Sequence, residues 1–110
     1  MWRGAGYAAR SAATIALIAP AMADEGEGAR AQYDLGQATI SMMLAATDLG
    51  IGSGHAWVAD QHLAWLVLGF PPDRFCAYLI VRGYPADRPL SPIKTPQRRA
   101  FDEVVHRETW

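Results

Sequence analysis

Apolar side chains follow two different periods along the first half of this chain of 110 residues. In residues 14–19 (TIALIA) they form a short run with β-branched side chains at alternate places, which is typical of a buried strand. From about residue 30 to residue 49 they recur at spacings of three and four, which is the period of an amphipathic helix. The stripe of this helix is formed by Leu35, Ala38, Met42, Ala45 and Leu49. The pattern therefore predicts a strand at 14–19 and a helix at 30–49, joined by an acidic, glycine-rich loop at 21–28.

The second half continues with short elements. Gly50 is placed to end the first helix in a left-handed conformation, and residues 51–58 form a short extended segment. Asp60 is a candidate N-cap for a helix at 61–68, which Gly69 and two prolines end. Residues 75–82 (FCAYLIVR) are an almost continuous apolar run, which predicts a central strand covered on both faces.

Residues 83–110 have neither helical nor strand periodicity. Four prolines interrupt this stretch up to about Phe101, and each removes a backbone donor: Pro85, Pro89, Pro92 and Pro96. An extended tail of this kind gains order by wrapping around another surface. With two strands and two helices, the chain barely supplies the neighbouring strands and covering helices that the 75–82 strand needs. This favours a domain whose other half is missing, or an obligate partner.

Composition narrows the class of protein. Half of the residues (51 %) are hydrophobic and 19 % are charged, which predicts one globular domain. A net charge of −1 gives no basic excess for nucleic acid. The single cysteine, Cys76, lies in an apolar run and is expected to be buried and unreactive. No apolar run is long enough for a membrane span.

The N-terminal 23 residues allow two interpretations. Arg3 and Arg10, the apolar run and the Ala21-Met22-Ala23 sequence together imitate a secretory signal. The alternating β-branched residues and Pro20 at the end of the run favour a strand instead. We therefore expect a cytoplasmic protein, with export as the alternative.

Two groups of residues could bind a ligand. Residues 50–54 (GIGSG) imitate a dinucleotide-binding loop but follow a helix instead of joining a strand to one, so they also fit a simple helix stop and bend. Lys94, Arg98 and Arg99 are either a solvated basic stretch or a phosphate clamp, since guanidinium groups bind phosphate oxygens in pairs. Ser53 with His55 and Asp60 lacks a nucleophile elbow, and the three histidines lack metal-ligand spacing.

Several ordered segments resemble the C-terminal half of the FMN-dependent nitroreductase family. They are TIALIAP, YDLGQATISMMLAATDLGIGSG, LGFPPD, YLIVRGYPADRP and RRAFDEVVH. The resemblance implies a partial α+β nitroreductase-like domain over residues 1–110, with a mixed sheet flanked by helices and an extended C-terminal tail. It also implies a homodimer, or a complementing chain, with FMN at the interface.

The resemblance further implies an enzyme that carries two electrons from NAD(P)H through FMN to nitroaromatic, quinone or similar acceptors. Backbone groups at Ser53, Gly54, His55 and Ala56 would lie beside the flavin, and Arg99, then Arg98, would hold its phosphate. No side chain is expected to act as a catalytic acid or base, and no metal, nucleic acid or membrane partner is expected. Gln97 stands where some relatives have a further basic residue.

One departure from the family supports an alternative. The family begins with an Arg-Ser-x-Arg-like segment that binds flavin, whereas here Arg10-Ser11 is followed by two alanines. About the first half of the family's domain has no counterpart. The alternative function is therefore a non-catalytic interaction fragment that keeps the dimer-forming helix and the tail but no longer binds flavin.

Overall fold

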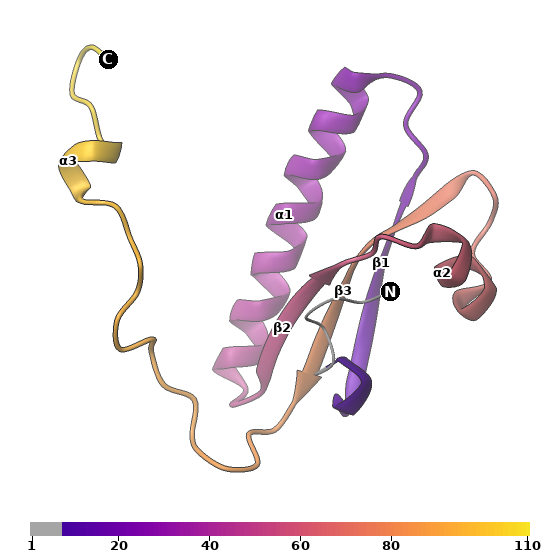
Figure 1. Cartoon of the computed structure of the whole chain (residues 1–110), viewed down its shortest axis with the longest axis horizontal. Coiled ribbons are helices and arrows are strands. Elements are labelled where there is room, and N and C mark those ends of the chain that lie inside the picture. Colours follow the sequence, from indigo (N-terminus) through magenta and orange to yellow (C-terminus); the bar gives the residue numbers. More distant parts are fainter. Residues whose placement is uncertain (1–7) are drawn as a thin grey trace.

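A computed structural model of the chain describes residues 8–110 (Figure 1). Three strands and two helices form the body, and they follow one another as β1 (Ala13–Pro20), α1 (Glu25–Asp48), β2 (Gly52–Trp57), α2 (Gln61–Leu68) and β3 (Arg74–Gly83). Two short turns complete the described elements, η1 (Ala8–Arg10) and α3 (Phe101–Val104). The predicted α+β class is confirmed. Within the described residues both strand pairs are antiparallel, so this sheet is not the mixed one that was expected.

The strand predicted to be central lies at the centre of the sheet, in the order β1-β3-β2. Ile80 is completely buried and its neighbour Val81 is 6 % exposed. Because neighbouring side chains of a strand point to opposite faces, both faces of β3 are covered. The extended segment at 51–58 proves to be a true third strand, since His55 pairs with Ile80 along the whole β2–β3 ladder.

Helix α1 begins five residues before its predicted start, inside the segment that was expected to be a loop. The Asp24 side chain accepts a hydrogen bond from the Glu27 backbone N–H (2.8 Å). The Glu27 carboxylate in turn accepts one from the Ala23 N–H (3.3 Å). These two bonds, with the favourable effect of acidic side chains on the first turn, outweigh the cost of two glycines there.

The inward face of α1 differs from the predicted stripe. Leu35 and Met42 are half-buried as expected, but Ala46 is the completely buried residue of this helix. Ala38, Ala45 and Leu49 are exposed. The predicted stripe was wrong because α1 has apolar residues on two sides, and their spacing does not show which side meets the sheet. The small side chain of Ala46 lets the helix approach the sheet closely.

The end of α1 was predicted correctly. Gly50 has a φ of 70°, and its N–H donates to the Thr47 carbonyl (3.0 Å). The Ile51 N–H donates to the Ala46 carbonyl (2.8 Å). These are the two hydrogen bonds of a Schellman motif, and they turn the chain directly into β2.

Helix α2 is fixed at both ends. The Asp60 carboxylate accepts from the Leu63 N–H (2.9 Å). Gly69 ends the helix, as predicted, and its backbone is left-handed. Gln61 joins the helix to β3, because its amide donates to the Cys76 carbonyl (2.7 Å) and accepts from the Cys76 N–H (2.9 Å). A small core cluster lies beneath, formed by Val58, Ala64, Phe70 and Cys76.

The two helices cover opposite faces of the sheet. Tyr78 lines a cavity with α1 side chains, whereas the adjacent Leu79 packs against the cluster below α2. On the α1 side, an Arg82 guanidinium nitrogen donates to the Met42 carbonyl (3.2 Å). The Nε atom of Arg82 is buried and makes no hydrogen bond.

The tail at 84–110 is extended and runs away from the sheet, apart from the single helical turn α3 (Figure 1). The radius of gyration is 16.9 Å, whereas a compact domain of this length would have about 13 Å. The tail accounts for the difference. All of its side chains are exposed, so the tail does not bury them against the body of this chain.

We expect Asp24→Ala to destabilise the fold, because the Glu27 N–H would lose its acceptor. The loss should be about 1 kcal/mol, or roughly 4–8 °C in melting temperature, measured by circular dichroism. Asp34→Ala is the matched control, since Asp34 is an exposed aspartate in the middle of the same helix. Equal melting temperatures for the two variants would contradict the capping role.

Cys76 should react with iodoacetamide only when the fold opens. The residue is fully buried, and burial raises the pKa of its thiol above the ordinary value. The folded state therefore keeps the proton longer than the unfolded state. Below the pKa of the unfolded thiol, both states are protonated and the free energy of unfolding does not change with pH. As pH rises above that pKa, the unfolded state loses its proton first, so the free energy of unfolding decreases. Alkylation followed by mass spectrometry at pH 8 should be at least tenfold slower without urea than in unfolding urea.

Candidate functional site

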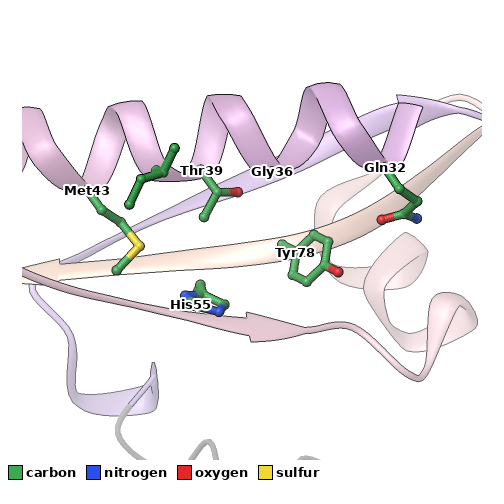
Figure 2. A pocket seen from close by; sticks show the side chains of 7 residues that line it. Gln32, Gly36, Thr39, Met43, His55 and Tyr78 are labelled. Atoms are coloured by element: carbon green, nitrogen blue, oxygen red, sulfur yellow. The ribbon is translucent and has the colours of Figure 1, made fainter. Parts of the chain in front are cut away.

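A cavity of about 330 Å³ lies between α1 and the sheet (Figure 2). Its volume is in the lower part of the range for small-molecule sites. The helix contributes Gln32, Gly36, Thr39, Ile40 and Met43. His55 of β2 and Tyr78 of β3 face them from the sheet (Figure 2).

The lining of this cavity is apolar with a few hydrogen-bonding groups. Ile40, Met43 and the Tyr78 ring supply the apolar surface, and an added Cβ at Gly36 would meet no atom within 4 Å. The Gln32 amide, the Thr39 hydroxyl and the His55 imidazole can donate or accept hydrogen bonds. None of the lining residues is an aspartate, glutamate, lysine or arginine, so the cavity suits an uncharged group.

His55 and Tyr78 form the floor of the cavity together. Their rings are 6.4 Å apart between centroids and meet edge to face, with an angle of 69° between their planes. The two residues are on neighbouring strands, because His55 pairs with Ile80 and Trp57 with Tyr78. The antiparallel register therefore fixes their relative position.

The four residues predicted to lie beside a cofactor are brought together. Ser53, Gly54, His55 and Ala56 all belong to β2, and all but His55 are half-buried. Strand β2 pairs with β3 on one side only among the described residues. Alternate backbone groups of an edge strand point outward from the ladder, so this strand offers backbone hydrogen bonds beside the cavity.

The two predicted phosphate ligands lie elsewhere. Arg98 and Arg99 are exposed in the part of the tail just before α3, and Figure 1 shows α3 well separated from β2. The Arg99 Nε lies 3.6 Å from a Glu103 carboxylate oxygen, and both side chains are largely exposed. A pair of this kind adds little stability, so Arg99 is available for another anion.

Sequence reasoning missed the helix side of the cavity. Gln32, Gly36, Thr39 and Met43 follow one another at spacings of four, three and four, so they share one helix face. The sequence pattern that could have revealed this side is the line of small and polar residues along the helix before the predicted ligand loop. It was overlooked because the apolar stripe was assigned to another face.

Other kinds of site find no support among residues 8–110. No three His, Cys, Asp or Glu side chains in that range gather as metal ligands would. No helix there has both the length and the hydropathy needed to cross a bilayer. A wider hollow of about 670 Å³ between the end of α1 and residues 85–90 contains none of the predicted ligand residues.

The fold has a close counterpart among solved structures. A nitroreductase family protein from Clostridium difficile 630 superimposes with a TM-score of 0.68 and 20 % sequence identity. The superposition covers 100 % of this chain and 70 % of the other. No protein-family model matches the sequence, and no curated protein does so either.

The chain has a nitroreductase-like fold. The resemblance seen in the ordered sequence segments is thus confirmed for the fold. The superposition shows the nitroreductase-like architecture, and at 20 % identity it shows nothing about activity. The body and tail of this chain together account for the matched length.

The lining of the cavity can be compared with the two parts of an FMN molecule, its ring and its phosphate. A flavin ring is flat, largely apolar and rimmed by amide groups, which agrees with the uncharged cavity and the edge of β2. The phosphate needs cations, and no cation lines the cavity. The lining therefore suits the uncharged ring of such a group and not its phosphate.

Proposed function

We propose that this chain is a flavin oxidoreductase, or one half of such an enzyme. It would transfer two electrons from NAD(P)H through FMN to a nitroaromatic, quinone or similar acceptor. The observation that carries the proposal is the cavity beside β2 in a chain whose full length matches a nitroreductase family protein. The cofactor supplies the electron-transfer chemistry when it is bound.

The chain's own residues would bind and orient the flavin ring. Backbone groups at Ser53, Gly54, His55 and Ala56 would lie along one edge of the ring. Ile40 and Met43 would exclude water from the α1 side, and no side chain is assigned as a catalytic acid or base.

Arg99 and Arg98 would hold the phosphate after the tail has moved from its exposed position and docked beside the cavity. From Gly83 to Arg99 the chain advances 16 residues, which span up to about 50 Å when extended. That reach exceeds the largest dimension of the molecule, 45 Å. The arginines can therefore reach a cavity of the same chain or of a partner, and a homodimer or a complementing chain provides the second surface.

A second candidate function, a non-catalytic interaction fragment, is favoured by an apolar stripe on α1. Tyr33, Ile40 and Leu44 are exposed by 72, 52 and 62 %, and their spacing of seven and four puts them on one side of the helix. At 100° per residue the centre of this side is opposite to Leu35, Met42 and Ala46, which face the sheet. Ile40, which also lines the cavity, lies at its edge. Exposed apolar residues in such a line mark a contact surface, with or without flavin.

Adding FMN should raise the melting temperature of the chain and quench FMN fluorescence. Arg98→Ala together with Arg99→Ala should weaken binding by at least tenfold, because each guanidinium–phosphate bond contributes about 1.5–3 kcal/mol. The control is Arg30→Ala with Arg107→Ala, which removes the same charge from two exposed arginines. Equal FMN affinity in both double variants would disprove the phosphate assignment.

Gly36→Leu tests the ring position independently in the same titration. The added side chain would occupy the cavity while raising helix propensity by about 0.5–1 kcal/mol. FMN binding should disappear from a protein that is at least as stable as before. A Gly36→Leu chain that still binds FMN would show that the ring lies elsewhere.

Association through the α1 stripe should be measurable by light scattering on a sizing column. The wild-type chain should elute as a dimer without flavin, and Leu44→Asp should make it monomeric, because a charge would be buried at the contact. Ala45→Asp adds the same charge one residue further along at an exposed position and should remain dimeric. A monomeric wild-type chain would eliminate the second candidate.

A further inference from the structure

The first part of the tail lies against the end of the body before the tail runs away. Residues 85–90 line the wider hollow of about 670 Å³ together with Thr47 and Gly50, at the end of α1. The Leu90 side chain lies over Gly52, because one of its methyl carbons is 3.6 Å from the position that a Cβ on Gly52 would occupy. Leu90 therefore contacts the first residue of β2.

The exposure of apolar side chains along the tail agrees with this contact. Leu90 is 45 % exposed, whereas Tyr84 before it and Ile93 after it are 76 and 77 % exposed. Pro85 and Pro89 also fix the backbone φ angle at two positions between β3 and Leu90. A short, stiff segment that is held by β3 at one end and by Leu90 at the other has little freedom to move.

Glycine at position 52 makes the contact with Leu90 possible. Gly52 pairs with Gly83 at the end of the β2–β3 ladder, and a Cβ at position 52 would lie 3.2 Å from the Gly83 carbonyl oxygen. A larger side chain there would crowd the backbone of β3 and displace Leu90. Because Gly52 directly precedes the four residues predicted to lie beside the cofactor, the contact fixes the tail next to the candidate site.

We propose that Leu90 anchors the tail, so that residues 84–90 form a fixed arm and residues 91–110 form a strap that closes over the cavity of the same chain. The closure rests on the proposed function, whereas the anchor does not. Leu90 acts as a positioning residue, since it determines the point from which Arg98 and Arg99 reach for a phosphate.

The length of the strap fits the cavity of its own chain. Arg98 is eight residues beyond Leu90, which span up to about 28 Å when extended. His55 is three residues beyond Gly52, a distance of about 10 Å along β2. The odd separation places these two residues on opposite faces of the sheet, so the strap has to cross the outer edge of β2, which has no partner strand among the described residues. Figure 1 shows α3 on the side of α1 that is away from β1.

The anchor also increases the local concentration of the arginines at the cavity. Without it, the flexible segment before Arg98 would begin at Gly83 and advance 15 residues instead of 8. The effective concentration at the end of a flexible linker falls roughly as the −3/2 power of its length, so loss of the anchor should weaken FMN binding about two- to threefold.

A protease that cuts before aspartate tests the anchor without flavin. The arm contains Asp87 and the strap contains Asp102, and both are exposed. In the wild-type chain the cut before Asp87 should be slower than the cut before Asp102. Leu90→Ala should accelerate the cut before Asp87 about fivefold, because the variant loses roughly half of the burial of a core leucine. The cut before Asp102 should keep its rate.

Ile93→Ala is the matched control for the cleavage experiment, since it shortens an apolar tail residue that is more exposed than Leu90. It should be cut like the wild type at both aspartates, and the circular dichroism of both variants should remain that of the wild type. Equal rates before Asp87 in the wild-type and Leu90→Ala chains would overturn the anchor.

An FMN titration tests the closure. Leu90→Ala should bind FMN about two- to threefold less tightly than the wild type, and Ile93→Ala should bind it equally well. In a chain that already carries Arg98→Ala and Arg99→Ala, the Leu90→Ala change should have no further effect. A Leu90→Ala chain with wild-type affinity, or an effect that persists without the two arginines, would overturn the closure.

A mixing experiment shows which chain the strap serves. The Gly36→Leu chain keeps an intact strap, and the Arg98→Ala, Arg99→Ala chain keeps an intact cavity. If each strap closes over its own cavity, an equimolar mixture should bind FMN no more tightly than the two variants do separately. Tight binding restored by mixing would assign the strap to a partner chain. A wild-type chain that binds no FMN would disprove the proposed function and with it the closure, and the cleavage rates would still decide the anchor.

Discussion

The need to cover both faces of strand β3 with very few residues determines most of this structure. Cys76, Ala77, Ile80 and Val81 are all buried, although the described residues place a single helix over each face. Close contact is achieved with small side chains, since four alanines and one cysteine are among the nine buried apolar residues. A core of small residues removes little apolar area from water. Larger apolar side chains are consequently left on the outside of both helices and along the tail.

The candidate site divides its requirements between two parts of the chain. The cavity below α1 is uncharged and shaped by helix spacing and strand register, which are rigid features. The positive charge is carried by a tail that makes no contact with the cavity in the free chain. An anionic ligand would therefore be recognised in full only after the tail has docked. The ordering of the tail and the binding of the ligand would favour each other.

Much of the fold could be predicted from local signals in the sequence. The TIALIA strand, the Asp60 and Gly69 caps, the Gly50 stop and the central strand at 75–82 all depend on neighbouring residues or on simple periodicity. The start of α1 was missed because the glycines at 26 and 28 suggested a loop, whereas the reciprocal Asp24 and Glu27 bonds decided in favour of a helix. The third strand was underestimated because β2 is short and rich in glycine, and only pairing with β3 makes it a strand.

Of the residues that line the cavity, His55 was the one named from the sequence. Ser53 to Ala56 are consecutive, so one local segment brings them together. The α1 side of the cavity depends on which face of the helix meets the sheet, and a helix with apolar residues on two sides does not decide that locally. The separation of Arg98 and Arg99 from β2 depends on where a tail without secondary structure lies. Neither periodicity nor residue type carries that information.

Strand β1 has a further consequence for the behaviour of the chain in solution. It is an outer strand of the sheet, and its eight residues, ATIALIAP, contain no charge. Natural edge strands usually carry lysines, bulges or other obstacles against pairing with foreign strands. Here Pro20 and the irregular register between Leu17 and Ile18 protect only the last residues. Among the described residues the outer edge of the TIAL stretch has no partner strand, so we expect it to add a foreign strand at high concentration without unfolding.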